Sequence, residues 1–197
     1  RTNPTNGTVV VNGNGTIKYI PNPNYHGLDS FMYKVCDNGT PVLCDSAWVR
    51  LNILDVNDGP DAIDDTASVN EDDSVTIDVR LNDTDIDGTL NNPTIRTNPT
   101  NGTVVVNGNG TIKYIPNPNY HGLDSFMYKV CDNGTPVLCD SAWVRLNILD
   151  VNDGPDAIDD TASVNEDDSV TIDVRLNDTD IDGTLNNPTI RTNPTNG

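Results

Sequence analysis

Residues 122–148 read GLDSFMYKVCDNGTPVLCDSAWVRLNI, and this stretch has the broadest apolar faces in the chain. Its first part places Phe126, Tyr128 and Val130 at alternate positions, and its last part repeats the alternation from Ala142 to Ile148. A period of two residues indicates a strand with one buried face. Asn-Gly and Pro between the two parts favour a turn. We therefore predict two strands at the centre of a β-sandwich.

The rest of the chain repeats around this stretch. Arg1 to Gly7 returns unchanged at Arg96 to Gly102 and at Arg191 to Gly197, so the period is 96 − 1 = 95 residues. Solenoid repeats are shorter, roughly 20 to 50 residues. Each repeat should therefore fold around its own hydrophobic core. Verbatim copying favours a spacer or a multivalent binder, because either gains from every copy.

Strand and turn signals alternate throughout the repeat, without a helix period. Val75 to Val79 alternates apolar with polar residues, and the Asn-Gly-Asn-Gly run at 107–110 predicts a hairpin turn between two β-rich segments. Shorter strands are predicted near 62–69 and 90–95. Seven strands in such a repeat predict an all-β, immunoglobulin-like Greek-key sandwich.

The domain boundary is predicted at the breaker Asp58-Gly59-Pro60. Residues 59–153 then form one complete domain, 1–58 the later strands of a preceding repeat, and 154–197 the first strands of a following one. Isolated half-sandwiches expose core faces and strand edges, so neighbouring chain must complete them. Because the chain starts and stops at the same point of the repeat, we expect a slice of a longer array. A self-assembling filament with half-domains completed by other chains is the alternative.

The chain is strongly acidic, with 30 acidic against 11 basic residues and a net charge of −19. Nucleic acid and anionic membranes are poor partners for it. Twelve of the fifteen acids of a repeat fall between Asp55 and Asp87, which points to bound cations. No apolar stretch approaches the roughly 18 residues of a membrane span, so we expect no membrane insertion in this segment.

Each repeat has one cysteine pair, Cys36 with Cys44 and Cys131 with Cys139. The residues between them contain Asn-Gly and Pro, and both cysteines fall on the parity opposite to the apolar face. Two such cysteines on neighbouring strands can meet, which favours a disulfide and an oxidising, extracytoplasmic location. Free thiols and a metal site are the alternatives, although a metal site needs more than two thiols or a nearby histidine.

Two acidic turns are the candidate cation sites. Asn82 to Gly88 carries Asp83, Asp85 and Asp87 at alternate positions, a spacing that lets several oxygens converge on calcium, which takes six to eight of them. The segment Asp55 to Asp61 lies at the predicted domain boundary. The alternative is that these carboxylates only cap turns and repel one another in solvent.

At these residues the sequence resembles the cadherin-like repeats of bacterial surface proteins, including large adhesins. Asp55-Val56-Asn57-Asp58 resembles the Asp-x-Asn-Asp linker between cadherin domains. Glu71 resembles the glutamate of the Pro-Glu-Asn motif, and Asp85-Ile86-Asp87 the Asp-x-Asp pair. Residues 24–33, NYHGLDSFMY, are similar to the Asn-x-x-Gly-x-Asp-Ser-Phe-x-Tyr signature of the bacterial branch. The cadherin Leu-Asp-Arg-Glu motif is missing.

The resemblance implies a set of calcium ligands at the junction of two repeats. Glu71 would act with the linker Asp150 to Asp153 that closes its own repeat, and Asp180 and Asp182 would come from the next domain. Calcium would then stiffen the array by bridging domains. Over the whole chain the candidates are Asp55, Asn57, Asp58, Glu71, Asp83, Asp85, Asp87, Asp150, Asn152, Asp153, Glu166, Asp178, Asp180 and Asp182.

Short Asp-Ser/Thr-apolar triplets resemble the motif that some bacteria O-glycosylate after export. They place candidate sites at Ser46, Thr66, Ser74, Ser141, Thr161 and Ser169.

The sequence thus predicts a structural, extracellular repeat at a cell surface: a calcium-stiffened stalk or filament of a bacterial adhesin. Its expected partners are neighbouring repeats of the same or another chain. The alternative is a module that binds glycans or proteins, such as cell-surface glycans, by avidity. No enzyme is expected, because His26 and His121 lie in loops without a nearby nucleophile and are interpreted as turn residues.

Overall fold

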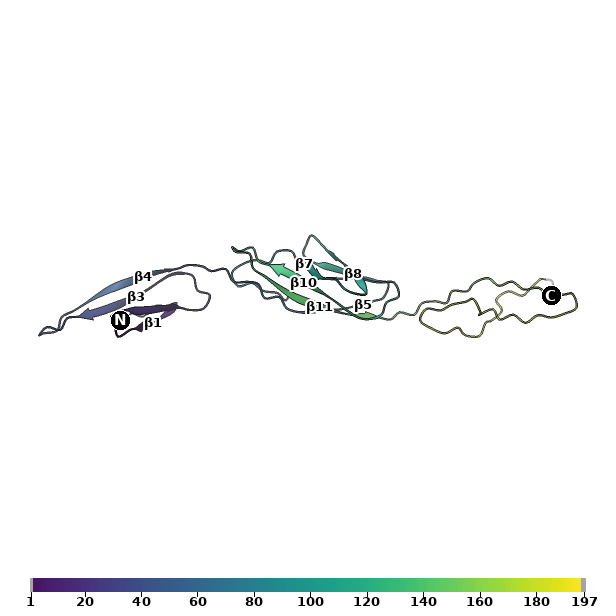
Figure 1. The fold of residues 1–197 in the computed structure, drawn as a ribbon, viewed down its shortest axis with the longest axis horizontal. Coiled ribbons are helices and arrows are strands. Elements are labelled where there is room, and N and C mark those ends of the chain that lie inside the picture. Colours follow the sequence, from purple (N-terminus) through teal and green to yellow (C-terminus); the bar gives the residue numbers. More distant parts are fainter. Residues whose placement is uncertain (1, 196–197) are drawn as a thin grey trace. The chain divides into compact units, whose positions relative to one another are not determined.

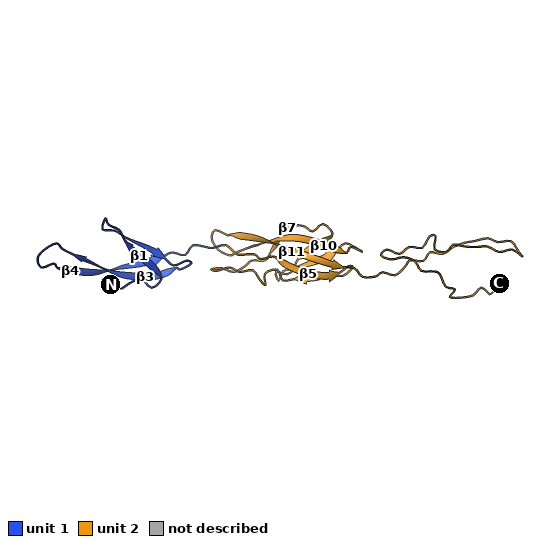
Figure 2. Cartoon of the chain, turned by 90° about the horizontal axis from the view of Figure 1, so that it is seen from below, with its two compact units in different colours: residues 1–58 blue, residues 59–197 orange. Residues whose placement is uncertain are grey.

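The computed structural model describes residues 2–195 (Figure 1). The chain divides into two compact units, Arg1–Asp58 and Gly59–Gly197 (Figure 2). Residues 1, 196 and 197, which belong to the predicted half-repeats, lie outside the described residues. Within residues 2–195 no helix is long and apolar enough to cross a membrane.

Seven strands in the second unit form two sheets. The larger sheet has the order β5-β11-β10-β7 and the smaller one the order β6-β9-β8. Because successive strands switch repeatedly between the sheets, the two sheets make an immunoglobulin-like sandwich, and the predicted fold class and strand number are confirmed. The strands are β5 (Asp65–Asn70), β6 (Val75–Ile77), β7 (Thr94–Thr97), β8 (Gly102–Val106), β9 (Ile112–Pro116), β10 (Gly122–Cys131) and β11 (Cys139–Leu149).

The alternating stretch at 122–148 forms the centre of the larger sheet, as predicted. Strands β10 and β11 pair antiparallel, with Phe126 opposite Val144 and Tyr128 opposite Ala142. All four side chains are buried. Burying one large apolar side chain contributes about 1.5 to 3 kcal/mol, so this pair of strands supplies much of the driving force for folding. Strand β5 joins β11 in parallel, and β7 joins β10 antiparallel.

The smaller sheet closes the core from the other side with Ile112 and Tyr114 of β9, both fully buried. The Tyr114 hydroxyl donates to Asp124 Oδ2 at 2.9 Å, and the same oxygen accepts the Asn101 N–H at 2.9 Å. A Cβ on Gly102 would come within 2.6 Å of the Tyr114 ring. Glycine is therefore required where β8 begins.

The short strands differ from their predicted limits. The strand expected at 90–95 is β7, which begins directly after Pro93, a residue without the N–H that a ladder needs. The strand expected at 75–79 is shortened to β6, because Asp78 O accepts the Leu81 N–H at 3.3 Å and turns the chain. Strand β5 likewise begins later than predicted.

The first unit consists of two hairpins. Strand β1 (Gly7–Val11) pairs with β2 (Ile17–Pro21), and β3 (Gly27–Cys36) pairs with β4 (Cys44–Ile53). These pairs keep the registers of β8 with β9 and of β10 with β11. Among the described residues of this unit, Phe31 is the one buried apolar side chain. The hairpins therefore form without a closed core.

Both predicted disulfides are present, Cys36–Cys44 and Cys131–Cys139. In each hairpin the two cysteines face each other in the strand register. Asp132 organises the loop beyond its disulfide, since its Oδ1 accepts the Gly134 N–H at 3.2 Å and the Leu138 N–H at 3.0 Å.

Candidate calcium site at the end of a repeat

Parallel pairing of β5 with β11 brings Glu71 to residues 150–153, which follow β11 and were predicted to be a linker. Asn70 lies opposite Leu149, so the residue after β5 meets the residues after β11. The Leu149 carbonyl accepts the Glu71 N–H at 2.9 Å, and Glu71 Oε1 accepts the Val151 N–H at 2.6 Å. The Glu71 side chain is only 4% exposed. A buried carboxylate is thus fixed beside Asp150.

His121 joins these two carboxylates, and the sequence interpretation missed it. It directly precedes β10, whose first residue, Gly122, pairs with Ile148 near the end of β11. Its Nδ1 lies 3.3 Å from Asp150 Oδ1 and 3.9 Å from Glu71 Oε2. One ligand atom from each of the three side chains lies within 4.8 Å of the others. The antiparallel strand ends were the signal that could have placed His121 here.

Further acidic groups lie where the chain continues past Asp153. The Asp153 N–H donates to Asp182 Oδ2 at 2.7 Å, so a carboxylate of residues 154–195 contacts the linker. Asn119 has a left-handed φ of 55°, and its N–H donates to Asp72 Oδ1 at 3.1 Å. When the side-chain amide of Asn119 is oriented with its nitrogen toward the acids, this nitrogen donates to Asp153 Oδ2 at 3.1 Å.

Asp83 lies elsewhere, inside the sandwich. Its Oδ1 lies 2.9 Å from the Tyr128 hydroxyl and accepts the Ile63 N–H at 2.8 Å. Burial raises the pKa of Asp83. Burial, followed by the charge of Asp83, raises the pKa of Asp65 to about 6. Asp83 thus anchors a core tyrosine, and among the described residues the cluster of three candidate ligand atoms is formed by Glu71, His121 and Asp150 and does not include Asp83.

Asp85 closes its own turn, with Oδ1 accepting the Gly88 N–H at 2.7 Å and the Asp87 N–H at 3.2 Å. Asp180 does the same for Gly183 at 2.8 Å.

The remaining candidate ligands are spread over residues 55–58 and 152–195. Asp55 Oδ1 lies 3.1 Å from His26 Nδ1, which repeats the contact between Asp150 and His121. Asp178 accepts the Ile158 N–H at 2.8 Å. The other candidates are exposed or partly exposed: Asn57, Asp58, Asn152 and Glu166.

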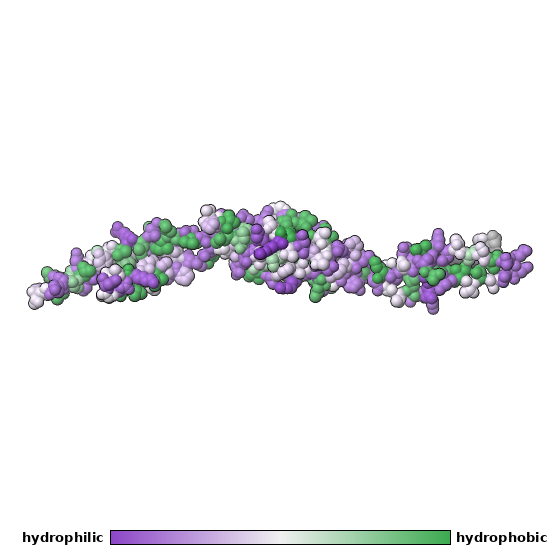
Figure 3. All heavy atoms as spheres, viewed as in Figure 1, coloured by the Kyte–Doolittle hydropathy of each residue, from purple (hydrophilic) through white to green (hydrophobic). Residues whose placement is uncertain are grey.

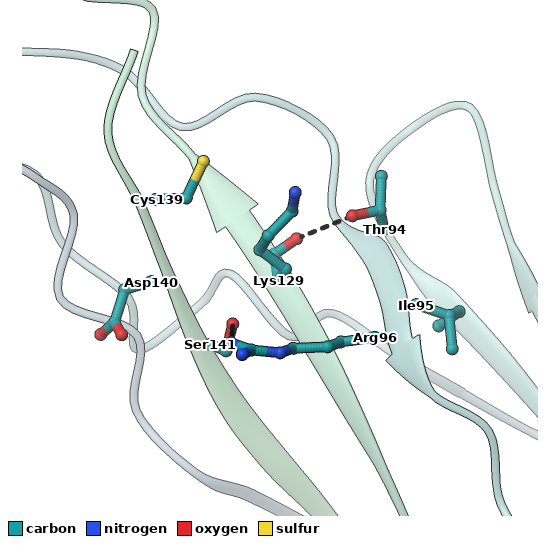
Figure 4. A pocket seen from close by; sticks show the side chains of 7 residues that line it. All are labelled: Thr94, Ile95, Arg96, Lys129, Cys139, Asp140 and Ser141. Carbon is teal, nitrogen blue, oxygen red and sulfur yellow. Dashed lines mark hydrogen bonds between the residues drawn. The ribbon is translucent and has the colours of Figure 1, made fainter. Parts of the chain in front are cut away.

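A shallow pocket of about 460 Å³ lies over β7, β10 and the start of β11. Figure 4 shows the Arg96 side chain reaching toward Ser141, whose Oγ accepts a hydrogen bond from Arg96 Nη1 at 3.0 Å. This hydroxyl, a predicted O-glycosylation site, is therefore already bonded. Ser74 is also partly exposed, whereas the other predicted sites are exposed: Ser46, Thr66, Thr161 and Ser169.

The carboxylates of Glu71 and Asp150 fit a hard cation, whereas the nitrogen of His121 is not a donor that calcium prefers. Carboxylate oxygens are the preferred ligands of calcium, and Glu71 presents one from a buried, hydrogen-bonded side chain. A buried carboxylate is costly without a compensating partner. A cation held between Glu71 and Asp150 would supply that partner.

The sequence model of the bacterial Ig domain matches residues 1–52 and 57–147 of the chain. The chain belongs to this family. The match covers more than half of the chain and agrees with the immunoglobulin-like sandwich formed by strands β5 to β11.

These bacterial Ig domains also resemble cadherins. The Fat-like cadherin-related tumor suppressor homolog of Drosophila melanogaster is 32% identical over 127 residues, 59% of this chain and 3% of that protein. The structure titled as a cis-dimer of protocadherin gammaB7 domains EC3–6 has a TM-score of 0.49 at 18% identity, covering 82% of this chain and 43% of that one. For domains 3–6 of protocadherin Gamma B2 the TM-score is 0.46 at 16% identity, over 81% and 42%. The chain thus spans a small part of the curated relative and under half of these solved chains.

Proposed function

We propose that this chain is part of a calcium-stiffened stalk of a bacterial adhesin at the cell surface. The proposal takes residues 59–153 as one repeat and residues 1–58 and 154–197 as parts of its neighbours. The observation that carries it is the buried Glu71 carboxylate, bonded to the Val151 N–H at 2.6 Å at the end of that repeat. A metal ligand fixed at this place can help to hold two neighbouring repeats together, which is a structural role and not a catalytic one.

In this account Glu71 and Asp150 hold calcium from the repeat that ends, and Asp182 contributes from the residues that follow. Bound calcium supplies positive charge and oxygen coordination. The protein's own residues set the geometry: the parallel strands β5 and β11 fix Glu71, and the Asp153 N–H at 2.7 Å orients Asp182. Without a cation these carboxylates repel one another and loosen the junction.

Thermal melting and small-angle X-ray scattering in calcium and in EDTA test the proposal. At a hundredfold excess over Kd, binding adds about 2.7 kcal/mol, which raises Tm by roughly 10 °C for a domain of this size. Scattering should show a longer, stiffer particle in calcium.

A matched pair of variants locates the effect. Glu71→Gln should lose most of the calcium-dependent rise in Tm. Asp73→Asn, which removes the same charge from an exposed side chain nearby, should keep it. If the unmodified chain has the same Tm and the same scattering curve in calcium and in EDTA, calcium does not stiffen the junction and the proposal is wrong.

A further inference from the structure

The histidine beside the candidate calcium ligands has no role in calcium binding. Hydrophilic residues cover much of the molecular surface (Figure 3), and 30 of the 197 residues are acidic, so carboxylates alone do not mark a site here. Histidines are rare by comparison, since the chain has two. The Nδ1 atom of His121 lies 3.3 Å from Asp150 Oδ1 and 3.9 Å from Glu71 Oε2. An imidazole beside two carboxylates points to a cation that takes nitrogen as well as oxygen ligands.

The larger sheet brings these three side chains to the same end of three neighbouring strands. In the order β5-β11-β10, strand β5 runs parallel to β11 and β10 runs antiparallel to it. Glu71 directly follows β5, Asp150 directly follows β11, and His121 directly precedes β10. The paired strands therefore fix the positions of all three residues, and one ligand atom from each lies within 4.8 Å of the others.

A hydrogen bond between His121 and Asp150 does not account for this arrangement. Their N···O distance of 3.3 Å is longer than the range of roughly 2.7 to 3.2 Å for N–H···O hydrogen bonds. Two atoms that each lie about 2.0 to 2.1 Å from one zinc ion, at a tetrahedral angle, are roughly 3.3 Å apart. The contact with Glu71 is longer, and a small rotation of the imidazole, which is 56% exposed, can shorten it.

The buried glutamate gives a second, independent reason to place a cation here. The Glu71 side chain is 4% exposed, and its Oε1 accepts the Val151 N–H at 2.6 Å. Within residues 2–195 its Oε2 accepts no hydrogen bond, and this oxygen is the one that faces His121. A buried carboxylate oxygen without a partner is costly. A cation bound between Glu71 and His121 supplies the partner.

We propose that Glu71, His121 and Asp150 form a binding site for a divalent transition-metal cation, for which zinc is the probe. Zinc binds histidine nitrogens and carboxylate oxygens, and three protein ligands leave its fourth position open to water. Imidazole and carboxylate together suit zinc better than they suit calcium, which prefers oxygen ligands alone.

This inference rests on the same two carboxylates as the proposed function, but it does not require that calcium binds them. All three zinc ligands lie within residues 59–153, whereas the calcium proposal adds Asp182. Zinc therefore occupies Glu71 and Asp150 without a ligand from the residues that follow. The two cations exclude each other at these carboxylates, and zinc should oppose the stiffening that calcium produces.

Calorimetric titration of the 197-residue chain with zinc chloride in calcium-free buffer tests the site. His121→Asn and Glu71→Gln should each weaken zinc binding about tenfold or more, because loss of a group that merely supports a ligand already costs that much. His121 is half-exposed, so its substitution should leave the far-UV circular dichroism spectrum unchanged. His26→Asn is the matched control, since it removes the other histidine and should leave this binding unchanged.

Zinc absorption spectroscopy gives a direct view of the nitrogen ligand. In the His26→Asn chain, His121 is the one remaining histidine. The zinc-edge spectrum of this variant should show the scattering pattern of one imidazole. A spectrum without imidazole scattering overturns the proposal, and so does the absence of saturable zinc binding to the unmodified chain or zinc binding that His121→Asn does not weaken.

Melting curves separate this inference from the calcium proposal. His121→Asn should lose zinc binding and keep the calcium-dependent rise in Tm, whereas Glu71→Gln should lose both. If zinc binds through His121 but calcium leaves the Tm of the unmodified chain unchanged, the calcium proposal is wrong and the zinc site stands. If calcium raises Tm but zinc does not bind, the zinc site alone is wrong.

Discussion

Residues 59–97 and 154–192 share one sequence but differ in structure. The first segment supplies strands β5 to β7, and Val69 is 8% exposed. The second has no strand among its described residues, and Val164, the same position, is 53% exposed. The first segment has β9, β10 and β11 to pair with. Strand formation in this sequence thus depends on distant partners, as is general for sheets.

Turns behave differently from strands in the same comparison. Ile63 donates to Asp83 and Ile158 to Asp178, both at 2.8 Å. Asp61 forms an isolated antiparallel β-bridge with Thr84, and Asp156 forms the same bridge with Thr179. These contacts join residues 20 or 23 positions apart within one segment, so they form without β8 to β11.

Substitution of a core valine should give the largest difference in stability between the two segments. Val79 is fully buried, so Val79→Asp places an unpaired charge in the core and should cost about 5 kcal/mol or more, enough to unfold the sandwich. Val174→Asp, at the same position of the second segment, should leave its unfolding midpoint unchanged. Urea unfolding followed by circular dichroism at low concentration measures both. Equal losses would mean that the second segment also has a core.

Removing the disulfides should have the next largest effect. Replacing Cys131 and Cys139 by serine opens a loop with a sequence separation of 8 residues, which should cost the sandwich about 2 kcal/mol. The same change at Cys36 and Cys44 should not move the sandwich's midpoint, because that hairpin lies in the other unit. Urea midpoints of the two double variants test this, and a shift from the Cys36/Cys44 pair would show coupling between the units.

Acidity should produce the smallest effect. The pKa of Asp65 is raised to about 6 in the fold, so the folded state takes up a proton before the unfolded chain does. Stability should therefore rise as pH falls from about 7 toward 4. Asp65→Asn should weaken this dependence, because Asp83, whose pKa is also raised by burial, retains part of it. The substitution should add about 1 kcal/mol at pH 7, after allowance for the partial exposure of Asp65. Asp160→Asn is the control, because Asp160 is exposed. Urea unfolding at a series of pH values should show the same pH dependence of stability for this variant as for the unmodified chain.

The sequence was sufficient for the large features of the sandwich. Alternation from Phe126 to Val130 and from Ala142 to Ile148 located the central strands, and opposite parity located the disulfides. The limits of the short strands were not predictable in this way. Pro93 delayed β7, and a local turn at Asp78 ended β6, although Val79 remained buried.

Some residues of the candidate site were likewise predictable from the sequence, and others were not. Glu71 and the linker were found from a motif resemblance, and parallel pairing of β5 with β11 brings them together. Asp83 was assigned to a cation from spacing alone, yet it is directed to Tyr128, a partner 45 residues away. His121 has no nucleophile near it in the sequence, so nothing in the sequence marks it as functional. Only the strand ends show that it lies next to Asp150.

A crystal structure of the chain grown in calcium, with anomalous data, would show directly whether a cation lies between Glu71 and Asp150. We expect an anomalous peak coordinated by Glu71 and Asp150, with an oxygen of Asp182 in or beside the coordination shell. Clear density for all three carboxylates, hydrogen-bonded only to protein and water and without an anomalous peak among them, would contradict it.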